Sequence, residues 1–337
     1  MIFSTRDKII LRELSANSRV SLLKLSKKLG CSYVTIGKII RKLNKELDIK
    51  YVLELDFEKL GFQQMHILLV KFNMKISKDQ IKQLVENDSS IIAAYLTKGQ
   101  YNMVVIAAEN NPINYLLWEF GFIQRITEFN GEIKSSDMPY FIFGYIPIEN
   151  MLIDKIKIKI KNNEIQLLKL LNENSRISYS ELSKKLKLNE STIRYKVFKL
   201  TKLGIIKRFT IAVQRPPQTY ILSMFENWLS FSKNFEDEAD RERKHMLTID
   251  DKVNDKIPIL TSVQIAAPLC GSYGNFIMAL FDSKADAINN MIKKHYEFYK
   301  KEKYIEKHAQ ILEAVKGFLP LRNLDIKEGY KVIKWVV

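Results

Sequence analysis

The chain contains one segment twice. Residues 17–29 read NSRVSLLKLSKKL and residues 174–186 read NSRISYSELSKKL, so nine of thirteen positions are identical at a constant offset of 157. An internal repeat on this scale restricts a chain of 337 residues to folds in which some supersecondary unit occurs twice. The identity of that unit is therefore the first question.

The first copy predicts three short helices separated by tight turns. Ser4 or Thr5 caps the first, Ser21 the second and Ser32 the third, and Gly30 supplies the left-handed turn that ends the second. Apolar residues recur at three- and four-residue spacing in each segment, as in amphipathic helices. The second copy predicts helices at about 164–171, 180–186 and 190–202, then an apolar strand or wing at 203–213. This succession is typical of a winged helix-turn-helix.

The positive charge of the chain is concentrated in the two repeated parts. The chain has 54 basic and 38 acidic residues, a net charge of +16. Residues 1–50 and 151–215 carry +8 and +11, whereas residues 51–150 and 216–337 carry −4 and +1. Charge segregated in this way indicates a polyanionic partner, and we expect double-stranded DNA.

The segments after each helix-turn-helix predict α/β sandwiches. Between residues 65 and 140 the order is strand, helix, strand, strand, helix, strand, as in a ferredoxin-like unit. The second segment follows the same order around a charged insertion at about 232–255. The sequence predicts an α+β fold with a tandem duplication, in which two winged helix-turn-helix domains alternate with two ferredoxin-like βαββαβ domains. The expected domain boundaries are 1–50, 51–150, 151–215 and 216–337.

The stretch LLKLLNENSRISYSELSKKLKLNESTIRYKVFKLTKLGIIKRF, residues 167–209, closely resembles the winged helix-turn-helix of the Lrp/AsnC (leucine-responsive, feast/famine) transcription regulators. The resemblance covers nearly the whole chain. It implies that the α/β units are ligand-sensing RAM domains and that the chain resembles two subunits fused into an intrachain pseudo-dimer. It also implies that RAM-like domains can form a homo-oligomer.

The polar face of each third helix is the expected DNA-reading surface. Hydroxyl and guanidinium groups there can reach base edges, and lysines can neutralise phosphates. The expected DNA-binding residues are Tyr33, Thr35, Lys38, Arg41 and Lys42 in the first copy, and Ser191, Thr192, Arg194, Tyr195, Lys199, Lys207 and Arg208 in the second. Because Gly37 occupies the place of Arg194, we expect the second copy to be the stronger DNA contact and the operator to be asymmetric.

The resemblance also implies an effector site. In the family, a Gly-x-Tyr-Asp turn between the second and third RAM strands lies near the effector, which is a small molecule such as an amino acid. The corresponding residues here are Gly99, Tyr101 and Asn102 in the first unit, and Gly271, Tyr273 and Asn275 in the second. Both turns carry Asn where the family often has Asp.

Two alternative functions remain open. A side branch of this architecture resembles sirohaem decarboxylases, which need histidine and arginine clusters, but His66, His245, His295 and His308 are all separated in sequence. No nucleotide-binding loop, H-E-x-x-H or G-x-S-x-G motif is present. We therefore expect no catalytic residue, cofactor or metal site. The other alternative is a protein-binding adaptor of the transcription machinery.

The sequence predicts a cytoplasmic protein. Cys31 and Cys270 are too few and too far apart for a disulfide framework or a paired metal site. The N-terminal residues become charged at Arg6, which is unlike a signal peptide, and no apolar run is long enough to span a bilayer.

Overall fold

The computed structural model describes residues 4–139, 143–144, 146–147, 150–153, 160–213, 220–227, 263–270, 272–273, 275–281, 283–288 and 305–320. The helices are α1 Thr5–Ala16, α2 Leu22–Leu29, α3 Tyr33–Leu47, α4 Lys78–Val85, α5 Pro112–Thr127, α6 Asn150–Ile153, α7 Asn162–Glu173, α8 Tyr179–Leu186, α9 Glu190–Lys202 and α11 Lys284–Ala287. The strands are β1 Ile49–Leu55, β2 Gln64–Phe72, β3 Ile91–Gly99, β4 Met103–Glu109, β5 Gly131–Pro139, β6 Phe143–Gly144, β7 Ile206–Val213, β8 Tyr220–Asn227, β9 Val263–Cys270, β10 Asn275–Phe281, β11 Ile305–Lys316 and β12 Leu319–Pro320. None of the helices in these ranges combines the length and apolar character needed to cross a bilayer.

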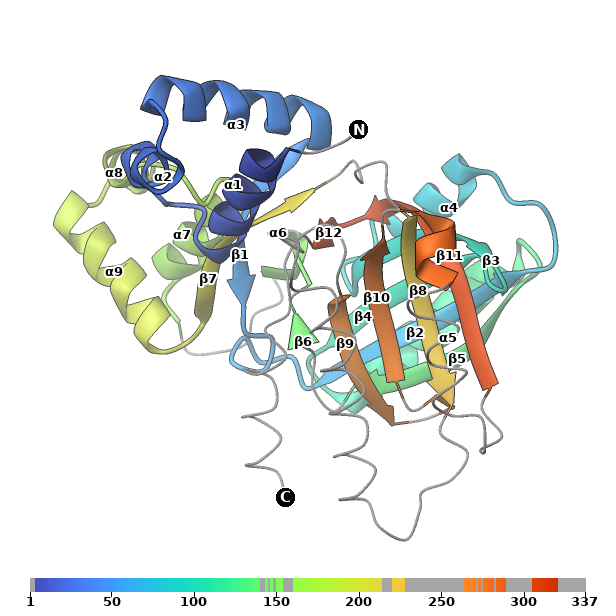
Figure 1. Cartoon of the computed structure of the whole chain (residues 1–337). Helices are drawn as coiled ribbons and strands as arrows, with labels where there is room; N and C mark the ends of the chain where they lie inside the picture. The colour runs from blue at the N-terminus through green and yellow to red at the C-terminus, as the bar shows by residue number, and fades with distance from the viewer. Residues whose placement is uncertain are drawn as a thin grey trace, which may run out of the picture.

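Both copies of the repeat form three helices, and the first copy has the three expected serine caps. In the second copy Ser178 caps α8, whereas Asn189 precedes α9 without a side-chain capping hydrogen bond. Ser4, Ser21 and Ser32 each accept a hydrogen bond from the third helical N–H of their helix. Gly30 ends α2 with a φ of 60°, and Lys187 takes the same left-handed conformation after α8 with a φ of 52°. Lysine adopts that conformation at a cost that glycine avoids. The two helical trios lie together at one end of the molecule (Figure 1).

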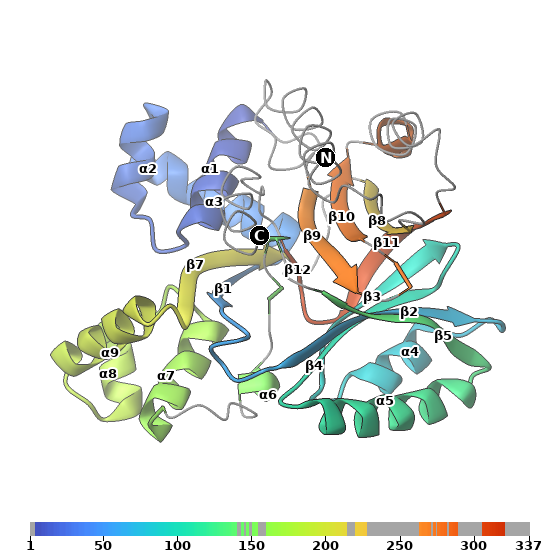
Figure 2. The ribbon, with the colours of Figure 1, turned by 90° about the horizontal axis from the view of Figure 1, so that it is seen from below.

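The strand after each helical trio pairs with the other copy. β1 and β7 run antiparallel, from Ile49 opposite Val213 to Leu55 opposite Ile206. β12 adds two residues at the far edge of β7. The predicted strand at 203–213 is therefore confirmed, but its partner is β1, which lies some 150 residues away in sequence. In Figure 2 this ribbon runs between α1–α3 on one side and α7–α9 on the other.

Each half of the chain supplies four main strands of the nine-stranded sheet, and the two-residue β6 also pairs with β9. In the first half the chain order β2–α4–β3–β4–α5–β5 is the expected βαββαβ arrangement, with spatial order β3-β4-β2-β5. In the second half β8, β9, β10 and β11 take the equivalent order β9-β10-β8-β11. The α+β fold class is confirmed. The charged insertion at 232–255 and most of the second half's last helix lie outside the described residues, and the domain boundaries stay a prediction.

The two halves join into one sheet that closes on itself. β11 pairs along β3, from Ala309 opposite Gly99 to Lys316 opposite Ala94. β5 meets β9 at Met138 and Cys270, and β9 also pairs with β10. Eight strands thus form a continuous ring, which leaves few unpaired edges. In each junction the last strand of one half pairs with the second strand of the other.

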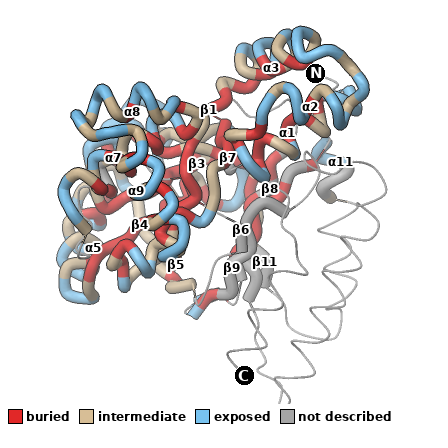
Figure 3. Tube along the Cα trace, turned by 90° about the vertical axis from the view of Figure 1, so that its left-hand side faces the viewer, coloured by how far each residue is buried: buried red, intermediate tan, exposed pale blue. Residues whose placement is uncertain are grey.

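The two faces of this sheet pack into separate cores. Along β2, Ile67 and Leu69 point into the ring, whereas Leu68 and Val70 point outward beneath α4 and α5. Figure 2 shows α4 and α5 side by side on this outer face. In Figure 3 β3, β4 and β7 are coloured mainly as buried, and exposed residues gather on the outer turns of the helices.

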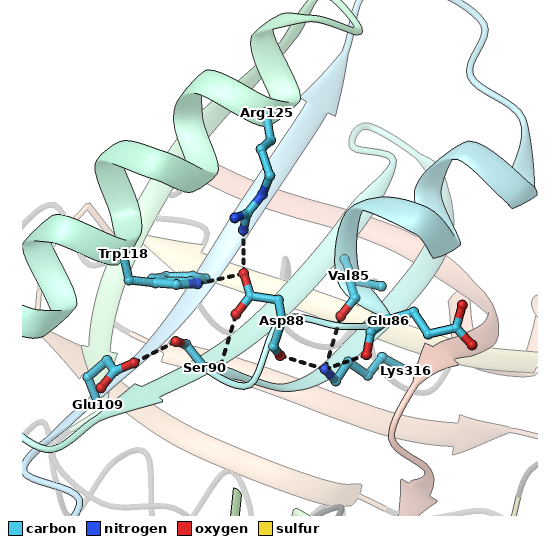
Figure 4. A network of polar contacts seen from close by, with 8 residues as sticks. All are labelled: Val85, Glu86, Asp88, Ser90, Glu109, Trp118, Arg125 and Lys316. Carbon is cyan, nitrogen blue, oxygen red and sulfur yellow. Dashed lines mark hydrogen bonds and ion pairs between the residues drawn. The ribbon is translucent and has the colours of Figure 1, made fainter. Parts of the chain in front are cut away.

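A buried lysine joins the second half to the first. Lys316, at the end of β11, is 5% exposed. Its ammonium group donates to the backbone carbonyls of Val85 at 3.0 Å, Glu86 at 3.0 Å and Asp88 at 2.5 Å, just after α4 (Figure 4). A cation at a helix C-terminus complements the helix dipole and satisfies carbonyls that the helix leaves open.

The carboxylate of Asp88 extends this network toward α5. It accepts hydrogen bonds from the Trp118 indole N–H at 2.8 Å, from the Arg125 guanidinium and from the backbone N–H of Ser90 at 2.9 Å (Figure 4). The hydroxyl of Ser90 in turn donates to Glu109 at 2.5 Å. The loop after α4 is therefore held by α5 of the first half and by β11 of the second.

We predict that Lys316→Met lowers the free energy of unfolding by about 3 kcal/mol, because three backbone carbonyls, that of Val85 buried, lose a charged donor. The measurement is urea denaturation followed by circular dichroism. Lys78→Met is the matched control, since Lys78 joins the same two elements through an exposed ion pair with Glu313 at 2.6 Å. Its loss should cost less than about 1 kcal/mol. Equal effects of the two substitutions would contradict the prediction.

Candidate nucleic-acid interface

The exposed face of α3 is cationic. Val34, Lys38, Arg41 and Lys45 are exposed and recur at three- and four-residue spacing, whereas Ile36, Ile40, Leu43 and Leu47 are buried on the opposite face. The predicted residues Tyr33 and Lys42 are also exposed, and the Thr35 hydroxyl lies 2.9 Å from that of its cap Ser32. Gly37 leaves open space beside this stripe.

The exposed face of α9 is more aromatic. Ser191, Tyr195, Phe198 and Lys202 occupy the positions equivalent to the α3 stripe, and Arg194, at the place of Gly37, is exposed beside them. The predicted Thr192 is partly exposed at the start of the helix. Sequence reasoning missed Phe198, which is 63% exposed, because a phenylalanine at helical spacing is read as a core residue. Its position one residue after the buried Val197 is the signal that could have found it.

Two predicted DNA-binding lysines instead contact buried acids at equivalent places in the two copies. Lys199 lies 3.0 Å from Glu164, and Lys42 lies 3.8 Å from Asp7. Burial acts to raise the pKa of Glu164, but hydrogen bonds from the Lys161 backbone and from Lys199 outweigh it, so that this pKa is below its ordinary value. These lysines hold the third helix against the first, and part of their charge is neutralised there.

Arg194 is also held by residues of its own copy. Its guanidinium pairs with Glu190 one turn earlier and lies over the ring of Tyr179, 4.6 Å from the ring centroid. Its side chain remains exposed, so it can still reach a partner.

The predicted cations on the strand pair across the ribbon. Lys207 lies 3.2 Å from Asp56, and Arg208 lies 3.5 Å from the buried Glu54. The Lys207 pair is largely exposed and therefore weak, whereas Arg208 pairs with a buried carboxylate. In this structure these two residues join β7 to the first copy.

The repeated NSR sequence makes reciprocal contacts between the copies. The hydroxyls of Ser18 and Ser175, both fully buried, lie 2.6 Å apart. The Ser18 N–H donates to the carbonyl of Phe209, and the Ser175 N–H donates to the carbonyl of Tyr51, each at 2.8 Å. This symmetric exchange fixes the two helical trios on opposite sides of the ribbon.

An arginine from the same sequence reinforces the contact. The guanidinium of Arg19 donates to the backbone carbonyls of Ser175 at 2.6 Å and Ile177 at 2.8 Å. It also lies between the rings of Tyr179 and Phe209, at 4.8 Å and 4.9 Å from their centroids. Such planar contacts suit arginine better than lysine.

The turn expected to bind an effector in the first half is packed against the second half. A side chain at Gly99 would lie 2.9 Å from the Cα of Ala309, so only glycine fits. The fully buried Tyr101 donates its hydroxyl to the carbonyl of Ser223 at 2.8 Å. The side-chain oxygen of Asn102 accepts from the N–H of Phe72 at 2.8 Å. The three residues expected to bind an effector therefore pack against, or hydrogen-bond to, other residues of the protein.

The equivalent turn of the second half lies against a buried acid. Asp137 on β5 is fully buried and accepts a hydrogen bond from the backbone N–H of Ser272. Burial raises the pKa of Asp137 and that of the neighbouring Tyr273 phenol, and the Asp137 carboxylate raises the pKa of Tyr273 further. Gly271 lies outside the described residues, and Asn275 begins β10.

The two histidines on strands do not share a site. His66 stacks on Tyr115 of α5, with ring centroids 3.7 Å apart, on the outer face of the first half. Burial lowers the pKa of His66. His308 precedes Ala309, which points into the ring, so strand alternation directs His308 to the outer face of the second half. The other two histidines, His245 and His295, lie outside the described residues.

Comparison with known sequences identifies one part of the chain clearly. A family model described as "Winged helix-turn-helix DNA-binding" matches residues 160–207. An uncharacterized HTH-type transcriptional regulator of Pyrococcus furiosus is 31% identical over 102 residues, which are 30% of this chain and 68% of that protein. The HTH-type transcriptional regulator LysM of Sulfurisphaera tokodaii is 38% identical over 52 residues, 15% of this chain and only 37% of LysM.

Comparison with solved structures extends over the whole chain. The siroheme decarboxylase NirDL matches 98% of this chain and 99% of its own, with a TM-score of 0.57 and 12% sequence identity. At this identity the likeness concerns the fold alone. The match shows that the two halves of this chain together correspond to one whole chain of that fold.

We predict that Tyr101→Phe lowers the free energy of unfolding by about 1–2 kcal/mol, because the buried Ser223 carbonyl loses its donor. Urea denaturation measures the change. Tyr33→Phe, at an exposed position on α3, should stay within about 0.5 kcal/mol of wild type. Unchanged stability of Tyr101→Phe would show that the hydroxyl has no structural role.

Proposed function

Because the chain belongs to the Lrp/AsnC family of HTH-type transcription regulators, we propose that it is a cytoplasmic, sequence-specific regulator that binds double-stranded DNA as an intrachain pseudo-dimer. The observation that carries this proposal is the reciprocal NSR contact, which holds one third helix on each side of the β1–β7 ribbon. A two-fold DNA site needs two recognition helices in a fixed relation. A fused chain supplies that relation without a second subunit.

The charges on the two helices support DNA as the partner. The α3 stripe exposes Lys38, Arg41 and Lys45, and the α9 stripe exposes Arg194 and Lys202. Phosphate neutralisation by such residues supplies most of the affinity of a DNA-binding protein. The sequence predicts that the second copy binds DNA more strongly than the first, and this stays a prediction. The count of exposed cations among these residues favours the first copy instead, with three on α3 and two on α9.

We propose that an effector such as an amino acid binds at the second-half turn around Tyr273 rather than at the first-half turn. The turn containing Tyr101 has its hydroxyl satisfied and its glycine against another backbone. Beside Tyr273, the buried carboxylate of Asp137 has its ionised form disfavoured by burial, and an ammonium group would restore it. Asp137 would thus supply the acid that the turn itself lacks.

A second candidate is a tetrapyrrole enzyme, which the full-length fold match to a siroheme decarboxylase favours. His66 and His308 lie on the outer face of the sheet in different halves, on strands separated by β3 and β4, which argues against a shared histidine site. A purified protein that is colourless and unchanged in its visible spectrum by added sirohaem would exclude this candidate. An adaptor function would instead use the exposed Tyr195 and Phe198 to bind protein.

We predict tight binding to a few fragments of the host genome, including the gene's own upstream region, with affinity that falls steeply with salt. Arg41→Ala and Arg194→Ala should each weaken specific binding by about 1–3 kcal/mol. Lys134→Ala, at an exposed position on β5 away from both helical trios, is the matched control and should have no effect. Fluorescence anisotropy at two salt concentrations measures these values. Equal affinity for all fragments, or no binding at low salt, would contradict the proposal.

We predict that the operator is asymmetric. Where α3 exposes Lys38 and Arg41, α9 exposes Tyr195 and Phe198, and aromatic side chains favour thymine methyl groups over guanine edges. Selection of bound sequences from a random library should return two unlike half-sites. The exchange Phe198→Arg should make them more alike, and Arg41→Phe should alter only the other half-site. A perfect palindrome selected by wild type would refute the prediction.

A further inference from the structure

The ring of Tyr179 contacts an arginine from each copy of the repeat. The guanidinium of Arg19, in the first copy, lies 4.8 Å from the ring centroid, and that of Arg194, in the second, lies 4.6 Å from it. Tyr179 begins α8 and packs against buried core residues. In Figure 2 the helices α1–α3 and α7–α9 lie on opposite sides of the β1–β7 ribbon, so this ring connects the first copy to α9.

Arg19 is anchored on more than one side. Its guanidinium donates to the carbonyls of Ser175 at 2.6 Å and Ile177 at 2.8 Å. It also lies 4.9 Å from the ring centroid of Phe209 on β7. A planar guanidinium that is bound by two carbonyls and stacked on aromatic rings keeps one orientation. The first copy thus supplies a rigid support for the ring of Tyr179.

Arg194 is the exposed group that this support reaches. Its side chain is 60% exposed, and its Nη2 pairs with Glu190 one turn earlier on α9. An exposed arginine ordinarily samples many rotamers, and ordering it on binding lowers affinity. The Tyr179 ring and the Glu190 carboxylate restrict that freedom before a partner arrives. Because a guanidinium presents five N–H donors in one plane, the restricted group can still donate to a partner.

The first copy lacks both members of this stack. At the repeat offset of 157, Leu22 stands in the place of Tyr179, and Gly37 stands in the place of Arg194. Leucine offers no aromatic face to a guanidinium, and glycine has no side chain to place there. The stack therefore belongs to the second copy alone, although both copies form the same three helices.

The supporting arginine is nevertheless present in both copies. Arg176, at the place equivalent to Arg19, lies 5.3 Å from the ring centroid of Tyr51 on β1. Each of the two arginines thus stacks on an aromatic ring of the β1–β7 ribbon. In the described part of the chain, only Arg19 continues through a second ring to an exposed arginine. Holding the copies together explains the stack on the ribbon but does not explain the stack on Tyr179.

We infer that Arg19 and Tyr179 are positioning residues for Arg194, and that Arg194 reads a guanine in the half-site of the second copy. This inference rests on the proposed function, because it assigns Arg194 a base in DNA. Arg194 lies in the N-terminal half of α9, the part of a recognition helix that contacts base edges. A planar guanidinium donates two parallel hydrogen bonds to O6 and N7 of guanine. The first copy thereby sets specificity at a base that the second copy reads.

The test uses the full-length protein and begins without DNA. The Nε–H signal of Arg194, assigned from its loss in Arg194→Lys, is recorded by NMR. The ring of Tyr179 is expected to shift this signal upfield in wild type and in Tyr179→Phe, which keeps an aromatic ring. Tyr179→Leu, which installs the residue found in the first copy, is expected to return the signal to its position in an unstructured peptide.

With DNA, the measured quantity is the ratio of dissociation constants for the selected site and for the same site with one guanine replaced. The guanine is the one at which Arg194→Ala loses discrimination. Wild type and Tyr179→Phe are expected to discriminate there by about tenfold or more, and Tyr179→Leu and Arg19→Lys by less than about threefold. Tyr179→Leu added to Arg194→Ala should change the ratio no further, because both act on one contact.

Arg176→Lys is the matched control, since Arg176 makes the equivalent stack on the ribbon. Any loss of stability from the contact between copies should be similar in Arg19→Lys and Arg176→Lys, whereas discrimination at the chosen guanine should fall in Arg19→Lys alone. Equal loss of discrimination in the two would overturn the inference.

Two further outcomes separate the inference from the proposed function. Specific binding in which Tyr179→Leu discriminates as wild type does, or an Arg194 signal that Tyr179→Leu leaves unchanged, would overturn the inference and leave the proposed function standing. A wild type without sequence-specific binding would instead remove the proposed function, and the inference with it.

Discussion

The pairing of β11 with β3 is the contact on which the rest of the structure depends. It makes one closed sheet from two halves that are far apart in sequence, and it allows Lys316 to reach the end of α4. Gly99 permits it because a side chain there would meet the backbone of β11. Tyr101 then enters the second half and binds Ser223. Since the inner core forms across this junction, separating the two halves would expose apolar surface and unsatisfied backbone groups.

The repeated segment acts at a second junction, between the two helical trios. Ser18 and Ser175 bind each other, and each donates its N–H to the strand of the other copy. Identical residues at equivalent places can satisfy one another only when the copies face each other in a two-fold manner. The repeated segment thus sets the relation between α3 and α9, and under the proposed function this is the relation that a two-fold DNA site requires.

Much of the local structure could be predicted from the sequence, because it depends on short-range rules. Helix caps such as Ser21 and Ser32, the turn at Gly30 and the βαββαβ order all act within a few residues. The candidate site was less predictable. Lys199 is charged in sequence but neutralised by Glu164, and Phe198 is apolar in sequence but exposed. Burial and pairing depend on neighbours that the local pattern does not specify.

The sequence by itself determined the duplication, the three-helix units, the strand order within each half and the blocks of basic charge. Only the tertiary structure decided which strands pair between halves, because register between distant segments depends on the packing of both faces and on close approaches such as that of Gly99 to Ala309. It also decided that one predicted effector turn is filled by Tyr101 while the other lies against Asp137. The two turns look alike in sequence and differ because each is completed by residues of the opposite half.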